Sequence, residues 1–577
     1  MLEPHARTLL FDILRPPEDH RLDIAVATTY TLDLLALLTA PVAFSLFEVD
    51  DQAELLNHDS LTLLESLRRY ADRLTVFCQA GQIAFPKAQF PQLEYLEHSV
   101  IECRRPGPGA SFHSKVWLLR FLGPDEGVRY RLACLSRNLT FDRCWDTGLT
   151  LEGPLLDRQK AIAANHPLGD FVQALPARAL RTVSQEIAGR VDRIQAEVRR
   201  VQFELPEGFD EYRFHPLGAG RRAALPFDGT DGRILIISPF VSQDGLRRVT
   251  KGRKGSILVT RPETLKEGAC RTPETERFFV LASEASPTST DVEEVPASKG
   301  LHAKCYIVDD GWNARVWTGS ANATESGFSR NVEFLVELVG PKSKFGIDAL
   351  LQSEDGKTSL ADLLQEMSAP DAPDQRDEIG DGLRAAIDRV RDSLSSAGLE
   401  ATIVEAEGGY DLRIISTSPL KDLPAETSVS CWPVTVGKGR SRPVDAGAVD
   451  VTFPALSVEG LSGFIAFEVR ASREGRNSIE TFVFNLPLEG APADRRERLL
   501  RSVLKDRRRL FQYLLLLLSD EGIELAERMR IEQHGNSLRA MGGRADTVIG
   551  STRSIHANAG TGPRASRSRR NVGGRYP

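Results

Sequence analysis

The chain has 577 residues, which is enough for three or four domains with cores of their own. Apolar residues make up 41% and charged residues 27% of the sequence, as in ordinary globular proteins. The net charge of −7 excludes an attraction of the whole protein to nucleic acid or anionic lipid, so any polyanion must bind at local patches.

The cysteines and the hydropathy of the sequence indicate the cellular compartment in which the protein is expected. The seven cysteines are scattered and show no CxxC spacing, which predicts reduced thiols and no metal site of the zinc type. The N-terminal segment lacks an apolar stretch behind basic residues, so no secretion signal is expected. The longest apolar run, Tyr513 to Leu518, is far shorter than the roughly 20 residues that span a bilayer. We therefore expect a cytoplasmic protein without a membrane partner.

In the first third of the chain, short apolar runs alternate with helical patterns, which is typical of an α/β layer structure. Strands are expected at 23–29, 43–47, 74–79, 115–121 and 130–136. Helices are expected at 32–38, 61–73 and, as a long connection rich in charge, 177–201. Residues 153–175 have the composition of loops or short helices.

The same order then returns. ILIISPFVS (234–242) corresponds to DIAVATTY, residues 256–260 correspond to LTVFCQ, and two further strands follow as KCYIVDD and ARVWTGS. This repeat predicts an α/β fold with two similar lobes and an active site between them.

Beyond the repeat, we expect a helix at 351–367, a linker at 368–375 rich in proline and acid, and a helix at 376–396. Regular short strands over 401–487 predict a small sandwich or barrel. A partly basic helix at 495–530 and a disordered basic tail complete the chain. The expected domains are 1–176 (first lobe), 177–205 (connecting helix), 206–367 (second lobe), 376–540 (C-terminal β-rich and helical domain) and 541–577 (tail).

Two copies of a His-x-Lys pair are the strongest signal in the sequence. His113-Ser-Lys115 and His302-Ala-Lys304 are each followed by a strand, a turn, a strand and a Ser-x-Asn, in a chain with only ten histidines. Residues i and i+2 of a strand share one face, so each histidine projects with its lysine. The Ser-x-Asn motifs contribute Ser136, Asn138, Ser320 and Asn322. An imidazole, an ammonium and an amide on one face suit a bound phosphate.

These motifs resemble the phospholipase D superfamily over roughly residues 20–345. The second copy matches better, with Asp309 five residues after the lysine, Gly319-Ser320-x-Asn322 and then Asn331-x-Glu333. The first copy has Arg120 in place of the aspartate. In this respect it resembles the variant found in tyrosyl-DNA phosphodiesterases and some bacterial nucleases.

The resemblance implies a two-step reaction without metal or cofactor. His113 would attack phosphorus to form a phosphohistidine, and His302 would act as general acid and base. The phosphate would be held by Lys115, Lys304, Asn138 and Asn322.

Supporting roles are expected for several neighbours. For the second copy, Glu333 matches the family's acid that orients the histidine. For the first copy, the candidates for this role are Asp146, Thr147 and Glu152, and the sequence does not decide among them. Ser136 and Ser320 either donate hydrogen bonds near the phosphate or form turns. Asp309, on the opposite strand face from Lys304, is expected to be a structural ion-pair partner.

The sequence favours a nuclease that cleaves DNA, in a setting such as defence against foreign DNA. The alternative is hydrolysis or transfer of a phospholipid or another small phosphodiester, and the second alternative is a degenerate protein that binds nucleic acid without cutting it. DNA is thus the expected partner, and the C-terminal domain could select a protein partner or a target.

Overall fold

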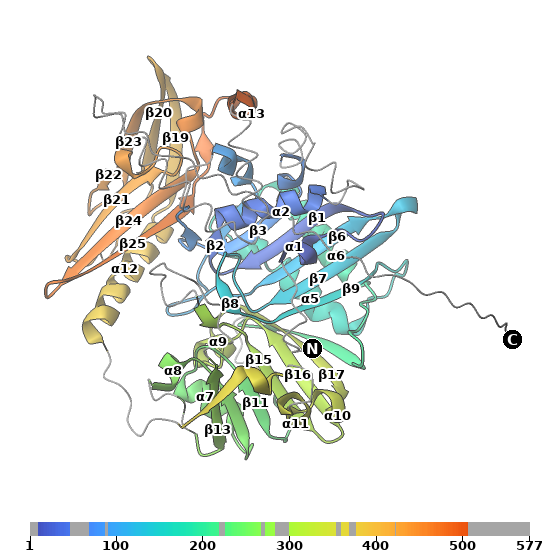
Figure 1. The fold of residues 1–577 in the computed structure, drawn as a ribbon. Helices are drawn as coiled ribbons and strands as arrows, with labels where there is room; N and C mark the ends of the chain where they lie inside the picture. Colours follow the sequence, from blue (N-terminus) through green and yellow to red (C-terminus); the bar gives the residue numbers. More distant parts are fainter. Residues whose placement is uncertain are drawn as a thin grey trace, which may run out of the picture. The chain divides into compact units, whose positions relative to one another are not determined.

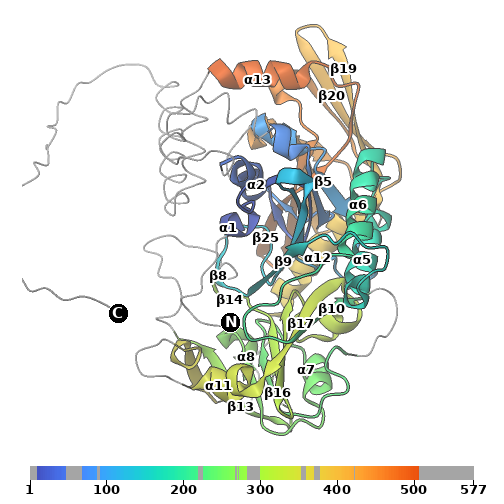
Figure 2. The same ribbon diagram turned by 90° about the vertical axis from the view of Figure 1, so that its right-hand side faces the viewer.

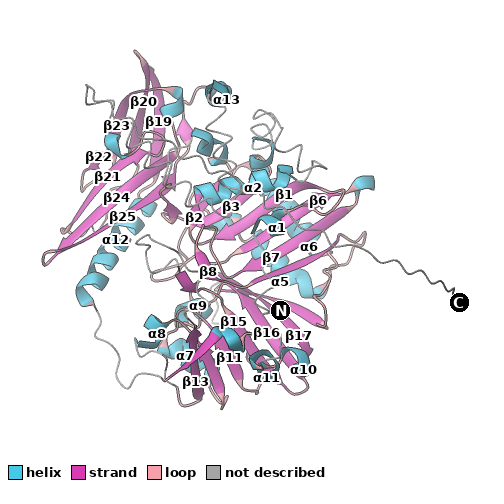
Figure 3. Ribbon diagram, in the orientation of Figure 1, coloured by secondary structure: helices cyan, strands magenta, loops and turns pink. Residues whose placement is uncertain are grey.

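The computed structural model describes residues 10–46, 68–86, 91–218, 225–266, 270, 272–282, 299–352, 359–368, 377–421 and 423–505 (Figure 1). The chain divides into two compact units, Met1–Leu518 and Ser519–Pro577, and every described residue belongs to the first. The described part is a mixed α/β structure, as the sequence predicted, with strands prominent throughout (Figure 3). Its helices contain no stretch long and apolar enough to cross a membrane.

A six-stranded sheet is formed by the first third of the chain. Its order is β5-β3-β1-β6-β7-β9. The three strands β1, β3 and β5 are parallel, and β6, β7 and β9 continue the sheet with antiparallel pairings. The bounds are Arg21–Thr29 (β1), Leu74–Gln79 (β3), Val100–Cys103 (β5), Val116–Leu122 (β6), Val128–Leu135 (β7) and Gly148–Pro154 (β9).

An eight-stranded sheet repeats this order and adds one strand at each edge. Its order is β10-β17-β16-β15-β11-β12-β13-β18. Here β11, β12 and β13 correspond to β1, β3 and β5, while β15, β16 and β17 correspond to β6, β7 and β9. The bounds are Glu211–Leu217 (β10), Ile234–Ile237 (β11), Ser256–Val259 (β12), Thr275–Leu281 (β13), Cys305–Asp310 (β15), Asn313–Gly319 (β16), Glu333–Pro341 (β17) and Leu364–Met367 (β18).

One hydrophobic cluster joins the two sheets. It contains buried strand residues from the first sheet, such as Leu118, and from the second, such as Ile307. Phe171 of helix α5 (His166–Gln173) packs on Phe334 of β17 with ring centroids 4.8 Å apart. Helix α6 (Gln185–Val198) contributes four buried aliphatic side chains and lies beside α5 (Figure 2). Apolar burial of this kind stabilises the shared core by about 25 cal/mol per Å² removed from water.

Three predicted elements differ from the structure. The strand expected at 43–47 lies, as far as it is described, in helix α2 (Leu34–Leu46), because a short apolar run reads the same in a buried helix and a buried strand. The helix expected at 351–367 is wrong: α11 (Ile347–Leu351) ends there, and β18 pairs with the edge strand β13. The connecting helix begins only at Gln185, where the Ser184 hydroxyl caps it.

The C-terminal region contains helix α12 (Glu378–Ser396) and two sheets of four and six strands. The four-stranded sheet is formed by β19 (Leu399–Ala406), β20 (Gly409–Ser416), β23 (Asp450–Leu456) and β26 (Leu488–Glu489). The six-stranded sheet joins β21 (Thr427–Pro433), β22 (Arg442–Val444), β24 (Phe464–Arg473) and β25 (Arg476–Asn485) to β2 (Leu32–Asp33) and β4 (Ile83–Ala84). Two strands near the N-terminus thus complete a C-terminal sheet. Helix α13 covers Arg495–Lys505; the rest of the helix expected to 530 and the basic tail lie outside the described residues.

The two sheets carry the same ion pair with its charges exchanged. In the second sheet, Arg233 is the residue just before β11. Its Nε donates to the carboxylate of Asp309 in β15 at 3.0 Å. In the first sheet the position five residues after the lysine is Arg120 of β6, and it pairs with Asp23 of β1 at 2.5 Å and with Glu197 at 2.8 Å. Arg120 therefore belongs to the internal ion pairs of its sheet.

Replacing Arg120 by methionine is expected to lower the free energy of unfolding by about 2 kcal/mol, because the carboxylates of Asp23 and Glu197 lose their shared guanidinium in a half-buried setting. Urea denaturation measures this change. Arg213→Met, which removes an exposed pair with Glu211, is the control and should cost less than about 0.5 kcal/mol. Equal effects of the two substitutions would contradict this role of Arg120.

Candidate active site

The two His-x-Lys pairs stand at corresponding strand ends. His113 and Lys115 directly precede β6, and His302 and Lys304 directly precede β15. The Ser-x-Asn motifs directly follow the neighbouring strands β7 and β16. Since β6 and β7 are antiparallel, as are β15 and β16, each pair and its Ser-x-Asn meet at the same end of their sheet.

Backbone hydrogen bonds bring the two half-sites together. The amide of His113 donates to the carbonyl of Val332 at 2.8 Å, and the amide of His302 donates to the carbonyl of Trp145 at 2.9 Å. The short strands β8 (Arg143–Trp145) and β14 (Lys299–Leu301) also pair across the two halves, and β8 lies between the large sheets in Figure 1. Each His-x-Lys segment is therefore held by the other half of the repeat.

Each histidine is bonded to an acid of the other half. Nδ1 of His113 lies 2.9 and 3.0 Å from the two carboxylate oxygens of Glu333. Nδ1 of His302 lies 3.1 Å from Oδ1 of Asp146. A carboxylate on Nδ1 holds the proton there and leaves Nε2 with a free lone pair. Both imidazoles thus present Nε2 as the nitrogen available for chemistry.

This pairing differs from the expectation that Glu333 serves the second copy. Glu333 is the first residue of β17 in the second sheet, and its side chain reaches His113 of the first half. Of the three candidates for the first copy, only Asp146 contacts a histidine among the described contacts. Thr147 accepts from the Thr318 hydroxyl at 3.0 Å, and Glu152 pairs with Arg129 and Arg131.

The two lysines are buried and folded back onto their own backbone. Nζ of Lys115 donates to the carbonyl of His113 at 2.6 Å, and Nζ of Lys304 donates to the carbonyl of His302 at 2.6 Å. Lys304 also donates to the carbonyl of Ser136 at 3.2 Å, across the two halves. Burial lowers the pKa of Lys115 well below its usual value, and it lowers the pKa of Lys304 to about 7. An anion between them would restore both charges.

The histidines are neutral in this setting. Burial and, to a smaller extent, the neighbouring charge of Lys304 lower the pKa of His302 to about 3, although Asp146 opposes the shift. Burial also lowers the pKa of His113, although Glu333 opposes the shift. Burial alone would raise the pKa of Glu333, but its interactions with His113, including their hydrogen bond, and with Lys115 bring it below the usual value. The arrangement is therefore a neutral imidazole beside an ionised carboxylate.

The amides of Asn138 and Asn322 are among the unpaired polar groups of the site. The Oδ1 atom of each is buried and has no hydrogen-bond partner within the described part of the chain. The two amide atoms of asparagine are interchangeable by a flip, so either side chain can donate to an anion. A buried amide without a partner costs about 1–3 kcal/mol, which a bound ligand would recover.

The serines of the Ser-x-Asn motifs hold the acids in place. The Ser136 hydroxyl accepts from the amide of Thr147 at 2.8 Å, and the Ser320 hydroxyl accepts from the amide of Phe334 at 3.0 Å. These amides directly follow Asp146 and Glu333 in the chain. Asp309 points away from the site, to Arg233, Lys342 and the amide of Ile347.

Sequence reasoning missed a second pair of hydroxyl residues. Thr29 ends β1, and its hydroxyl accepts from the amide of Leu139 at 3.0 Å. Ser238 follows β11, and its hydroxyl accepts from the amide of Ala323 at 2.9 Å. Each thereby fixes the residue after Asn138 or Asn322. The signal was present in the sequence, because a hydroxyl residue ends β1 and another directly follows β11.

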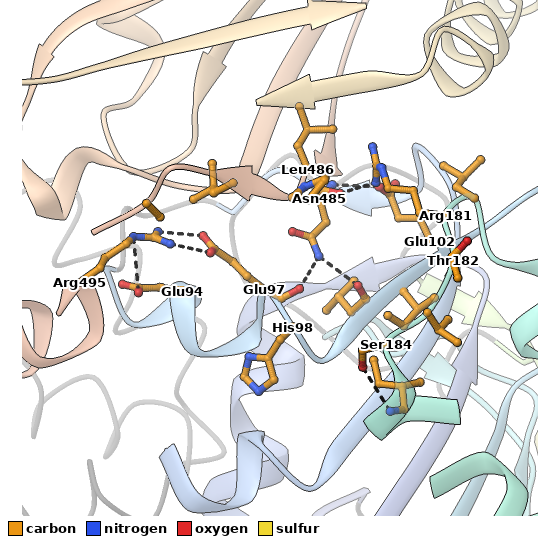
Figure 4. Close-up of a pocket in the computed structure, with 18 of the residues that line it drawn as sticks. Glu94, Glu97, His98, Glu102, Arg181, Thr182, Ser184, Asn485, Leu486 and Arg495 are labelled. Carbon is orange, nitrogen blue, oxygen red and sulfur yellow. Dashed lines mark hydrogen bonds and ion pairs between the residues drawn. The ribbon is translucent and has the colours of Figure 1, made fainter. Parts of the chain in front are cut away.

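A separate cavity of about 440 Å³ lies between β5 and the C-terminal strands (Figure 4). Several of its charged side chains are bound to other groups of the protein. Arg495 donates to Glu97 at 2.8 and 3.0 Å, and Glu102 accepts from the amides of Gly81 and Asn485 at 3.0 and 2.9 Å. These bonds tie the C-terminal region to the first sheet. The cavity contains neither of the two histidine–acid pairs.

The second half-site falls within a recognised domain. Residues 249–351 match the family model described as cardiolipin synthase, PLD-like domain, and this span includes His302, Lys304, Asn322 and Glu333. The chain contains a phospholipase D-like domain. The resemblance inferred from the paired motifs is confirmed at this level.

Other comparisons are distant. No curated protein matches the chain. A solved structure of yeast tyrosyl-DNA phosphodiesterase shares 11% identity, covers 58% of this chain and 86% of its own, and has a TM-score of 0.33. A mutant of the yeast enzyme shares 12% identity over 60% of this chain and 88% of its own, with a TM-score of 0.35.

Proposed function

We propose that the protein is a phosphodiesterase that cleaves nucleic acid, preferentially DNA, through a phosphohistidine. The observation that carries this proposal is the doubled site: two imidazoles, each bonded through Nδ1 to an acid of the other half, with two lysines and two unpaired amides beside them. One phosphate between the half-sites would meet a nucleophile on one side and a proton donor on the other.

In the first step, Nε2 of His113 forms a bond to phosphorus while the bond from phosphorus to the leaving oxygen breaks. His302 gives its Nε2 proton to that oxygen. The substrate's negative charge raises the pKa of His302 when it binds, so this histidine can carry the proton. In the second step, His302 takes a proton from water, the water oxygen bonds to phosphorus, and the bond to His113 breaks.

The assignment of His113 as nucleophile follows the resemblance and has support in the geometry. Glu333 is fully buried and lies within hydrogen-bond distance through both oxygens, whereas Asp146 makes one longer contact with His302. A more firmly held carboxylate stabilises the positive charge that a phosphorylated imidazole carries. Lys115, Lys304, Asn138 and Asn322 would stabilise the charge on the non-bridging oxygens.

The positive charge needed by the phosphate comes from side chains. In the described part of the chain, no group of three or more His, Cys, Asp or Glu residues is placed to hold a metal ion. We propose a reaction that persists when divalent ions are removed.

A nucleic-acid substrate is supported by arginines around the site. Arg137 lies between Ser136 and Asn138, and the exposed Arg330 closely precedes Glu333 in the chain. Such local basic groups are what a protein of net charge −7 requires to bind a polyanion. We further propose that the repeated sheets are the two lobes of a phospholipase D fold, and that the C-terminal region selects a target or a protein partner, with defence against foreign DNA as the setting.

A phospholipid is the second candidate substrate, because the matching family model is described as cardiolipin synthase. The deciding experiment offers single-stranded DNA, duplex DNA, RNA and phosphatidylcholine vesicles to the purified full chain in excess EDTA. DNA cleavage by the wild type, absent in His113→Ala, supports the proposal. Choline release alone would replace it with the lipid reaction, and binding without turnover would replace it with a degenerate site.

Binding of a phosphodiester should weaken as the pH rises through about 7. Lys304 has a pKa of about 7 in the free site and must be protonated to hold an anion. Lys304 is fully protonated well below pH 7 and loses its charge above that pH. The affinity for the phosphodiester should therefore fall by up to about tenfold for each pH unit above 7. Calorimetry with dimethyl phosphate, which does not titrate near pH 7, measures this change. Lys304→Met should bind weakly with a flatter profile; an unchanged profile would contradict the role.

A further inference from the structure

Arg261 occupies the same place in the second half as Gln79 in the first. Thr28 of β1 pairs with Phe77 of β3, and Ile237 of β11 pairs with Val259 of β12. The central strands have the same offset from the His-x-Lys strands, because Ala27 pairs with Trp117 and Ile236 with Tyr306. Two residues beyond Phe77 is Gln79, and two beyond Val259 is Arg261.

Both side chains hold the residue that precedes a site histidine. Oε1 of Gln79 accepts from the amide of Phe112 at 2.9 Å. Nε of Arg261 donates to the carbonyl of Leu301 at 2.6 Å. The two positions therefore share one structural task, but the second half performs it with a cation.

Among the residues that the structure describes, no acid neutralises the charge of Arg261. The side chain is only 8% exposed, yet no ion pair of Arg261 with a carboxylate occurs in the described ranges. Its Nη2 atom is buried and lacks a hydrogen-bond partner there. A buried guanidinium without a counterion is costly, and an anionic ligand would remove that cost. The simple positioning task, which glutamine performs in the other half, does not require this charge.

An exposed aromatic ring covers the guanidinium. The Arg261 guanidinium carbon lies 4.9 Å from the ring centroid of Phe240, and Phe240 is 46% exposed. Phe240 lies three residues after the end of β11, and its backbone carbonyl accepts a hydrogen bond from the Ser238 hydroxyl, which in turn accepts from the amide of Ala323. Phe240 is therefore adjacent to the His302 half-site. By the same strand register, the counterpart position in the first half is Thr31.

We propose that Phe240 and Arg261 form a subsite that stacks one unpaired base of the nucleic acid and binds a phosphate next to the scissile one. This inference rests on the proposed function and gives it a substrate class, single-stranded or frayed nucleic acid. Aromatic rings accept any base on their faces, so the subsite selects for an unpaired base and not for a sequence. Arg261 supplies a fixed bidentate donor for the phosphate.

The test measures binding by fluorescence anisotropy in the inactive His113→Ala background. The probes are an oligothymidylate and an abasic deoxyribose-phosphate chain of the same length and charge. Phe240→Ala should weaken oligothymidylate binding about tenfold and leave the abasic chain unaffected. Phe240→Trp should bind oligothymidylate as tightly as the protein with Phe240. Arg261→Gln, which installs the residue of the other half, should weaken both probes and reduce the slope of log Kd against log salt by about 0.7.

Trp312→Ala is the matched control. Trp312 is 96% exposed in the turn between β15 and β16, at the strand ends opposite His302, and should affect neither probe. If Phe240→Ala also affects neither probe, or weakens both equally, the stacking subsite is wrong even when the wild type cleaves DNA. If the wild type cleaves no nucleic acid but Phe240→Ala still weakens oligothymidylate binding selectively, the proposed reaction fails and the subsite stands.

Discussion

Replacing His113 by alanine is expected to lower kcat for phosphodiester cleavage by at least about 1,000-fold, because no other group can take its place as nucleophile. The change should leave the fold intact, since the backbone amide of His113 keeps its bond to Val332. Steady-state rates on a chromogenic p-nitrophenyl phosphodiester measure the loss.

In the His302→Ala variant, the reaction should stop at a later step than in His113→Ala. A p-nitrophenolate leaving group needs little protonation, so the first step can proceed and the second, which needs a base for water, should stall. The expected result is a burst of about one p-nitrophenol per active site and an acid-labile phosphate on the protein. Equal, burst-free losses in both variants would contradict the division of roles.

The chain offers a close control for both histidines. His215 of β10 also bonds to a glutamate of β17, with Nε2 2.7 Å from Glu337, but it lies outside the site. His215→Ala removes a histidine–glutamate pair from the same strand and should leave kcat within about twofold. A loss comparable to that of His113→Ala would mean that the effect reports on β17 and not on chemistry.

The paired motifs were predictable because their spacing is local. A His-x-Lys before one strand and a Ser-x-Asn after the next lie in one hairpin, so the sequence order alone indicates that they share a strand end. The same local logic identified the strand that became β1 and its counterpart β11. Family resemblance then supplied the roles that local spacing could not.

The acids could not be assigned in this way, because their partners depend on contacts between the halves. Asp146 and Glu333 are each close in sequence to their own Ser-x-Asn, yet both reach the histidine of the other half. Arg261 was missed for the same reason: its carbonyl partner, Leu301, is forty residues away in the sequence and meets it only in the folded chain. Non-local pairing also explains β18, where an edge of the sheet recruits a segment with a helical pattern.

Glu333→Gln is expected to lower kcat by about 100- to 10,000-fold. The amide fits the same buried space, but it cannot stabilise a positive imidazole and can hold the wrong tautomer. Glu333 raises the pKa of His113 in the wild type, so its loss should move the acidic limb of the pH–rate profile to lower pH. Glu152→Gln, which alters an acid paired only with Arg129 and Arg131 among its described ion pairs, serves as the control and should keep nearly full activity.

The crossed arrangement makes a sharper claim about which step each acid supports. Glu333→Gln should slow formation of the phosphoenzyme for every leaving group, because it acts on His113. Asp146→Asn acts on His302, so it should slow poor leaving groups more than p-nitrophenol and should let the phosphoenzyme accumulate. A leaving-group series with both variants decides between the two assignments. If Glu333→Gln gave the leaving-group dependence and Asp146→Asn did not, the roles of the two histidines would be exchanged, with His302 as the nucleophile.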